Sequence, residues 1–177
     1  MNIRAIAISI ALITSISGWV NTQHASAHEE TKISKQTDSK DKAIIERPDS
    51  YWKSKLDPHT YQVTRCSATE PAFSNKYWDN HRDGTYVCSN CGAILFDSKD
   101  KFDSGTGWPS FTKPQSGSVK IRPDLSIDIE RNEVICKRCG AHLGHLFTDG
   151  PAPTGERFCI NSASLNFDQN KPAQNVR

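Results

Sequence analysis

Cysteine is the residue type in this 177-residue chain with the most distinctive chemistry, and spacing divides the six cysteines into two groups. Four of them form two CxxC pairs inside a short internal repeat, CxxCGAxL, at residues 88–95 and 136–143. The glycine after each pair lets the backbone fold back over a metal, and four thiolates are the tetrahedral ligand set that structural zinc prefers. We therefore predict one structural Zn²⁺ per chain, with four ligands: Cys88, Cys91, Cys136 and Cys139.

Two other interpretations of the CxxC pairs stay open at this point. A thioredoxin-like redox site would place such a pair at the start of a helix in a βαβ unit, a pattern that this sequence lacks. Disulfides are the second alternative. The start of the chain predicts export, as described below, and an exported protein meets an oxidising environment in which disulfides form. The duplicated motif favours zinc, and four protein ligands would close the coordination sphere, so this metal would not carry out the chemistry.

Cys159 stands apart from the pairs, in the segment GERFCINSAS at residues 155–164. Alternate side chains of a strand share a face, so Arg157, Cys159 and Asn161 would lie on one side and Phe158 and Ile160 would point into the core. A neighbouring arginine favours the thiolate, which is the reactive form of cysteine. This environment favours a nucleophile over a buried small side chain or half of a structural disulfide.

Proton donors for such a nucleophile lie upstream of it. The segment AHLGHLFTDG contains two histidines and an aspartate, namely His142, His145 and Asp149. Together with Cys159 they predict a site with a Cys/His arrangement. A Cys/His hydrolase acting on an acyl carbon would use the same groups. A zinc-ribbon-like binding module would leave them without a role.

The elements that must position these residues are mainly β-strands. Asp57-Pro58 is a cap and first-turn pair that predicts a helix through Val63, and Asp49 or Ser50 could cap an earlier turn. Asp83-Gly84 predicts a hairpin turn before a β-rich segment. The segment at 157–167 predicts another strand. We therefore expect a mainly β fold with short N-terminal helices.

Alternating apolar residues between 118 and 136 predict two or three antiparallel strands with one buried face. The sequence breaks that divide them are Pro123-Asp124 and Arg131-Asn132. The apolar positions are Val119, Ile121, Leu125, Ile127, Ile129 and Val134.

The ends of the chain predict export. Residues 1–27 combine a charged start, an apolar run at Ala5–Val20 and small residues at Ala25-Ser26-Ala27, as in a secretory signal. The alternative is an uncleaved membrane anchor. We expect a periplasmic or secreted protein without stable membrane insertion after cleavage, with a flexible polar tether at 28–48, the working domain at 49–168 and a disordered tail at 169–177. A net charge of +2 gives no reason to expect a nucleic-acid partner.

Longer motifs resemble the methionine-R-sulfoxide reductase family of the B type. They are FDSGTGWPSF at 102–111, CGAHLGHLFTDGPAPTGERFCINSASL at 139–165 and the two CxxC pairs, and the similarity covers about residues 51–167. The resemblance implies two antiparallel sheets and a structural zinc far from the active thiol. It also implies reduction of the R epimer of methionine sulfoxide in proteins and peptides.

The resemblance also implies roles for individual residues. Cys159 attacks the sulfoxide sulfur and becomes a sulfenic acid, while Trp108 packs against the methyl group of the substrate. The protonation and hydrogen bonding of the sulfoxide oxygen would fall to a polar group of five residues: His142, His145, Asp149, Arg157 and Asn161.

One position departs from the family pattern. Many members carry a resolving cysteine within the SGxGW stretch, where this chain has Thr106. The remaining cysteine, Cys66 in VTRCSATE, is therefore expected to resolve oxidised Cys159 by forming a disulfide, which a thioredoxin-like donor would reduce. The alternative is that Cys66 is an idle thiol or is permanently linked to Cys159. We expect a monomer.

Overall fold

The computed structural model describes residues 44–127 and 129–169, within the compact unit Ser39–Arg177. The predicted signal at 1–27, most of the tether and nearly all of the predicted tail lie outside the described residues. Within the part that is described, no helix is long and apolar enough to cross a membrane.

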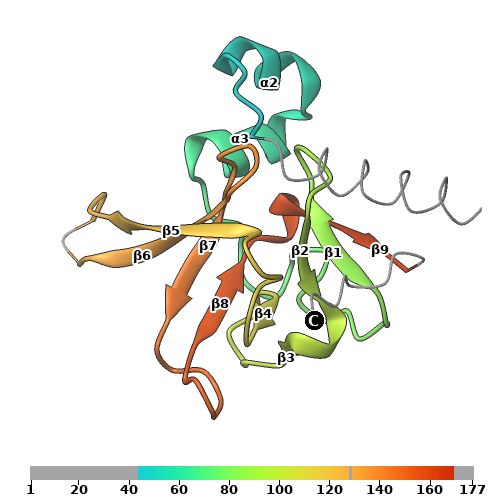
Figure 1. The fold of residues 1–177 in the computed structure, drawn as a ribbon, viewed down its shortest axis with the longest axis vertical. Helices are drawn as coiled ribbons and strands as arrows, with labels where there is room; N and C mark the ends of the chain where they lie inside the picture. Colours follow the sequence, from blue (N-terminus) through green and yellow to red (C-terminus); the bar gives the residue numbers. More distant parts are fainter. Residues whose placement is uncertain (1–43, 128, 170–177) are drawn as a thin grey trace, which may run out of the picture. The chain divides into compact units, whose positions relative to one another are not determined.

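Two short helices open the described part and lie at one end of the sheets (Figure 1). Helix α3 spans Pro58–Cys66, and its cap Asp57 accepts a hydrogen bond from the backbone of Thr60 at 3.0 Å, so the predicted helix is confirmed and continues beyond Val63. Helix α2 spans Asp49–Lys55. The predicted side-chain cap at Asp49 or Ser50 is wrong, because the N-cap residue is Pro48 and Asp49 already lies in the first turn. There its carboxylate is stabilised by the helix dipole.

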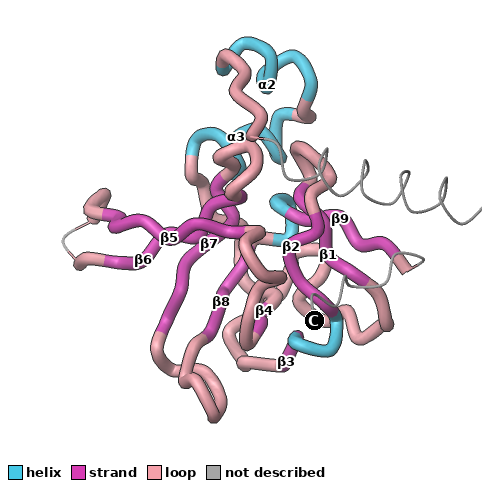
Figure 2. The backbone as a smooth tube through the Cα atoms, viewed as in Figure 1, coloured by secondary structure: helices cyan, strands magenta, loops and turns pink. Residues whose placement is uncertain are grey.

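The strands form two antiparallel sheets, as predicted (Figures 1 and 2). The three-stranded sheet has the order β2-β1-β9, with β1 at Thr85–Cys88, β2 at Ile94–Asp97 and β9 at Leu165–Asp168. The six-stranded sheet has the order β3-β4-β8-β7-β6-β5. Its strands are β3 Lys101–Phe102, β4 Ser110–Phe111, β5 Val119–Asp124, β6 Arg131–Cys136, β7 His142–Phe147 and β8 Arg157–Ile160. Two 3₁₀ turns, η1 at Ser98–Asp100 and η2 at Ser162–Ser164, complete the described elements.

Two strand predictions need correction. The segment at 157–167 is not one strand, because η2 interrupts it and sends β8 and β9 into different sheets. The Asp83-Gly84 turn does not join a hairpin, since β1 pairs only with β2 and β9 in the described structure. Gly84 is instead a point of close approach, where a Cβ atom would lie 2.6 Å from the carbonyl oxygen of Asp168.

The alternating segment at 119–134 forms two antiparallel strands, the hairpin β5–β6, which is the smaller of the two numbers predicted. Asp124 ends β5 because its side chain accepts a hydrogen bond from the backbone of Ser126 at 3.0 Å, which closes an Asx turn. The apolar residues after it therefore do not face the core. Leu125, Ile127 and Ile129 are 74%, 49% and 71% exposed.

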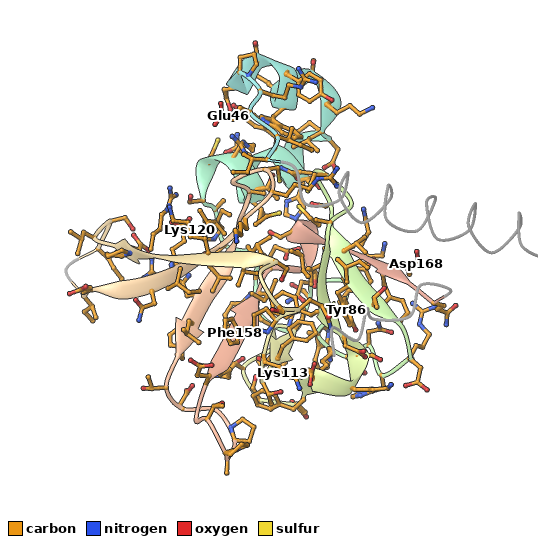
Figure 3. The ribbon with its side chains drawn as sticks, in the orientation of Figure 1. Glu46, Tyr86, Lys113, Lys120, Phe158 and Asp168 are labelled. Atoms are coloured by element: carbon orange, nitrogen blue, oxygen red, sulfur yellow. The ribbon has the colours of Figure 1, made fainter. Side chains whose placement is uncertain are left out.

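The hydrophobic core draws on both sheets. Phe96 of β2 stacks on Phe111 of β4 with ring centroids 4.3 Å apart, and Tyr86 of β1 meets the same Phe111 edge-on at 5.1 Å. Figure 3 labels Tyr86 and Phe158, core residues contributed by the two different sheets. Burying apolar side chains of both sheets in one cluster fixes which face of each strand is left for polar residues.

Candidate active site and metal centre

The four cysteines of the CxxC pairs converge on one point. Their sulfur atoms all lie within 4.8 Å of one another, and Cys88–Cys139 and Cys91–Cys136 are each separated by 3.7 Å. Tetrahedral zinc with Zn–S bonds of ~2.3 Å requires sulfurs about 3.8 Å apart, whereas a disulfide requires ~2.0 Å. The cluster therefore fits a metal ion, and its cysteines are free thiols.

The two knuckles that hold these thiols have the same backbone geometry. Gly92 donates to the carbonyl of Cys88 and Gly140 to that of Cys136, both at 2.8 Å, and both glycines have left-handed φ values of 73° and 69°. One knuckle follows β1 and the other follows β6, so a metal ion would join the two sheets. Neither pair opens a helix, so the thioredoxin-like interpretation of the CxxC pairs is wrong.

Cys159 lies near the middle of the six-stranded sheet. In the register of β7, β8 and β4 it is directly opposite His145 on one side and Ser110 on the other. Glu133 of β6 is opposite His145 in turn. Directly paired residues of neighbouring strands share a face, so these four side chains form a polar row across the sheet.

An irregularity in β7 adds His142 to the same face. Val134 pairs with Gly144 but the next residue, Ile135, pairs with His142, so Leu143 is an extra residue of β7. This bulge changes the alternation by one position. The rings of His142 and His145 consequently meet edge to face, with centroids 5.4 Å apart.

A pocket of about 160 Å³ opens over this polar row, with room for roughly five water molecules and hence for one unbranched side chain. Cys159, His145, Trp108 and Asn161 all line it. The pocket thus brings together four of the predicted site residues. Its full lining is Thr69, Trp108, Arg131, Gly144, His145, Phe147, Cys159, Ile160 and Asn161.

The electrostatic environment of Cys159 differs from the one inferred from Arg157 alone. Burial raises the pKa of the Cys159 thiol, and this effect outweighs the opposing influence of Arg157 and of a hydrogen bond with Thr106. Burial disfavours the charged form of a thiol because the protein interior solvates it poorly. Burial therefore favours the protonated thiol, whereas Arg157 acts in the predicted direction, toward the thiolate.

Arg157 and Asp149 form an ion pair beside the pocket. The Nε and Nη2 atoms of Arg157 donate to the two carboxylate oxygens of Asp149 at 2.8 and 2.9 Å. The guanidinium also lies 4.4 Å from the ring centre of Phe147, which lines the pocket. The hydrogen bond to Arg157 lowers the pKa of Asp149. Neither charged group lines the pocket itself, so their geometry supports the pocket wall.

Each histidine is held by a carboxylate from the β5–β6 hairpin. His145 Nε2 lies 2.8 Å from Asp124 Oδ2, which also accepts from Arg131 at 2.8 Å. These contacts, with the Ser126 hydrogen bonds as the largest cause, lower the pKa of Asp124 well below its usual range.

His142 is the more deeply buried of the two and does not line the pocket. Its Nδ1 lies 2.7 Å from Glu133 Oε1, and Glu133 is also paired with Arg122. Burial lowers the pKa of His142 although Glu133 acts in the opposite direction, so burial favours the neutral ring. Within the described structure its Nε2 is buried without a hydrogen-bond partner.

Glu70 connects the two remaining site residues. Its carbonyl accepts from Trp108 Nε1 at 2.9 Å, and its backbone N–H donates to Asn161 Oδ1 at 3.1 Å. Its own carboxylate is buried and accepts from the backbone of Ala163 at 3.0 Å. Asn161 lies just beyond the end of β8 and donates to the Leu143 carbonyl at 3.3 Å, so its amide ties η2 to β7 as well as lining the pocket.

Cys66 lies outside the pocket. It is the exposed last residue of α3, whereas Thr69, three residues later, is part of the pocket lining. Ser67 between them has a left-handed backbone with φ 57°.

Sequence reasoning missed several residues that surround the site. Asp124 and Arg131 were interpreted only as strand breaks, Glu70 and Glu133 carried no local motif, and Thr106 was noted only as the position of an absent cysteine. Alternation within β6 could have indicated Glu133, because a charged residue beside Val134 marks the polar face.

Comparisons with known proteins agree with these features. Residues 56–169 match the SelR domain family. The chain is similar to peptide methionine sulfoxide reductase MsrB of Acinetobacter baumannii, with 52% identity over 124 residues, 70% of this chain and 89% of that protein. It is 51% identical to the MsrB proteins of Thiobacillus denitrificans, over 68% of this chain and 92% of the relative, and of Methylibium petroleiphilum, over 76% and 98%. The chain therefore belongs to the SelR domain family and is homologous to the peptide methionine sulfoxide reductases MsrB.

Proposed function

We propose that this protein reduces methionine sulfoxide in proteins and peptides, that it acts on the R epimer, and that Cys159 is the nucleophile. The observation that carries this proposal is the position of His145 directly opposite Cys159 in a pocket that Trp108 also lines. The relatives named as peptide methionine sulfoxide reductases support the reaction class.

The raised pKa of Cys159 suggests where the proton needed in the first step comes from. The sulfur of Cys159 attacks the sulfoxide sulfur, and the sulfoxide oxygen must gain hydrogen bonds or a proton to make that sulfur electrophilic. The thiol itself carries a proton, and His145 is placed to pass it to the oxygen. The bond between the two sulfurs then breaks as the protonated oxygen passes from the methionine sulfur to Cys159. Methionine leaves reduced by two electrons, and Cys159 is oxidised by two electrons to a sulfenic acid.

Hydrogen bonds around the pocket would orient this step. Asp124 holds Nε2 of His145, so Nδ1 is the nitrogen that can turn toward the substrate. Trp108 would pack against the S-methyl group, and its fixed indole would select one epimer. His142 and the Arg157–Asp149 pair are positioning residues, and Asn161 ties the pocket wall to β7.

Recycling would use Cys66. Its thiol attacks the sulfenic sulfur of Cys159, a disulfide forms and water leaves, and a thioredoxin-like dithiol then reduces the disulfide by exchange. Because Cys66 lies outside the pocket, the end of α3 and residues 67–69 have to move toward Cys159, and Thr69 already reaches the pocket.

The remaining parts of the proposal concern the setting of the reaction. A zinc ion held by Cys88, Cys91, Cys136 and Cys139 would serve as a structural clamp between the sheets, since four protein ligands leave no open position. We also propose residues 1–27 as an export signal, 28–48 as a tether, 49–168 as the catalytic domain of a periplasmic or secreted monomer, and 169–177 as a disordered tail.

The test offers the chain from His28 a peptide with R- or S-methionine sulfoxide and dithiothreitol. We expect loss of the R epimer only, and no loss with Cys159→Ser. Cys66→Ser should keep a single turnover but lose cycling with thioredoxin, and unchanged cycling would show that Cys66 is idle. If the folded, zinc-loaded protein consumes neither epimer, the proposed function is wrong, and an acyl-enzyme trapped with an ester substrate would indicate a hydrolase instead.

A further inference from the structure

An apolar surface at the end of the β5–β6 hairpin has no role in the site described so far. Among the described residues, seven large hydrophobic side chains are exposed, and four of them belong to this hairpin. Three of these four lie at its end, and we call them the apolar tip: Leu125, Ile127 and Ile129, with exposed fractions of 74%, 49% and 71%. The fourth, Ile121, pairs with Val134 and therefore lies on the face opposite the polar row. Turns are normally polar, and a cluster of exposed apolar side chains marks an interaction surface.

The apolar tip is continuous with the candidate active site. Asp124 and Arg131 pair with each other at the base of the tip, both in the strand register and by an ion pair of 2.8 Å. Asp124 holds His145, and Arg131 lines the pocket. Leu125 therefore follows directly after a residue that contacts the site, and the hairpin projects sideways from the strands that carry the pocket (Figures 1 and 2).

We propose that the apolar tip docks apolar side chains that flank the oxidised methionine in an unfolded polypeptide substrate. This inference rests on the proposed function. An extended chain advances ~3.3 Å per residue, so residues two to four positions from the methionine sulfoxide would lie about 7–13 Å from the pocket, over the hairpin. Apolar contact is non-directional, which suits clients of many sequences.

The charges around the tip disfavour an anionic membrane as the occupant. Binding to such a membrane requires a cluster of unpaired lysines and arginines. Arg122 and Arg131 of the hairpin are both paired with carboxylates, and the other exposed charges of the described hairpin residues are one cation, Lys120, and one anion, Glu130.

Features of β5 disfavour a second copy of the chain. This strand is at the edge of the sheet, where another strand could add. Lys120, labelled in Figure 3, is exposed on that edge strand, and Pro123 lacks the backbone N–H that a pairing strand would need. These are features that prevent edge-to-edge association.

The experiment compares substrates of different length in the zinc-loaded protein. Two nine-residue peptides carry a central R-methionine sulfoxide with either leucines or serines three positions away on both sides, and N-acetyl methionine sulfoxide amide is the minimal substrate. We expect the wild type to prefer the leucine peptide about tenfold in kcat/KM, mainly through KM. The triple variant Leu125→Ser, Ile127→Ser, Ile129→Ser should lose that preference and keep its rate on the minimal substrate.

Ile44→Ser is the matched control, because Ile44 is 68% exposed and is not part of the hairpin, so it should keep the preference. A triple variant that still prefers leucine, or a wild type that uses both peptides equally, overturns the docking inference but not the reaction. Failure of the wild type on both peptides and on the minimal substrate overturns the proposed function itself. Binding to phosphatidylglycerol vesicles, or a dimer in sedimentation velocity, that is lost only in the triple variant would assign the tip to a membrane or a second copy and overturn the inference.

Discussion

The metal cluster and the pocket use cysteine in opposite ways. In the cluster, four sulfurs lie within 4.8 Å of one another and occupy equivalent positions in two matching knuckles. In the pocket, one sulfur faces a histidine on a neighbouring strand and open space. The cluster thiols have one another, or a shared ion, as partners, whereas Cys159 is left able to meet an incoming molecule.

The two regions also differ in how the chain assembles them. Each knuckle is a local motif, complete within eight residues of sequence at 88–95 or 136–143. The pocket combines residues from β6, β7, β8, the loop before β4 and the segment after α3. A substitution in the cluster should therefore reduce the stability of the whole fold. A substitution in the pocket should mainly change the activity.

Loss of one cluster ligand is expected to have the largest effect. Cys136→Ser should abolish metal binding and leave no cooperatively folded protein at 25 °C, because a structural zinc site contributes ~10–16 kcal/mol against a typical total stability of ~5–15 kcal/mol. Zinc content per chain and thermal melting by circular dichroism measure this. Cys66→Ser, at an exposed cysteine, should retain zinc and melting temperature. A Cys136→Ser protein that melts like the wild type would show that the cluster does not join the sheets.

A backbone contact inside the pocket region is expected to have the next largest effect. A Cβ atom on Gly144 would lie 2.0 Å from the carbonyl oxygen of Cys159, so Gly144→Ala must push β7 and β8 apart. We expect a loss of about 3 kcal/mol or more in the free energy of unfolding, measured in urea. Gly117→Ala controls for the left-handed backbone alone, since its nearest neighbour is the flexible end of Lys137 at 4.0 Å, and should cost about 1 kcal/mol. If both variants lose the same free energy of unfolding, the close approach of Gly144 to Cys159 does not contribute to stability.

The contrast between local and assembled regions also explains what the sequence could predict. The knuckles, helix α3 and the mainly β class depend on short-range patterns, and all three are confirmed. The two antiparallel sheets, also confirmed, were predicted from the family resemblance. The shared face of His142 and His145 could not be predicted from alternation, because residues three apart in a regular strand point to opposite sides. Only the bulge at Leu143 in β7 brings them together.

The errors have a similar cause. Leu125, Ile127 and Ile129 alternate as a buried strand would, yet the Asx turn of Asp124 ends the strand before them. The effect of Arg157 on Cys159 was correct in sign, but the burial that outweighs it comes from residues distant in the sequence.

Glu70 does not line the pocket but holds two residues that do, so a substitution at Glu70 should change the shape of the pocket without removing a reacting group. Glu70→Ala removes the carboxylate that accepts from Ala163 and frees the backbone that holds Trp108 and Asn161. We expect kcat/KM for an R-sulfoxide peptide to fall about tenfold, mainly through KM, since one hydrogen bond to a charged group contributes ~1.5–3 kcal/mol. Glu70→Gln keeps one acceptor oxygen and should lose less. Zinc content should be unchanged in both, and Glu46→Ala at an exposed position is the control. A fall in kcat with constant KM would contradict a positioning role.

We expect the smallest effect in the acidity of the cysteine thiols, which also differs between the metal cluster and the pocket. Within the cluster, hydrogen bonds between the thiols move their pKa values in opposite directions, lowering that of Cys136 and raising that of Cys139. For Cys159 the largest cause is burial, which raises the pKa. In a Cys66→Ser background, the rate of iodoacetamide alkylation at Cys159 should therefore rise with pH to a midpoint above that of an ordinary exposed cysteine. Thr106→Val removes a hydrogen bond that lowers this pKa, so the midpoint should rise and alkylation at pH 7 should slow by roughly threefold. A midpoint near 7 would mean that Arg157 outweighs burial and that the free protein holds a thiolate. Reactivity at Cys159 would then be present before substrate binds, instead of depending on the proton transfer to the sulfoxide oxygen that a protonated thiol and His145 require.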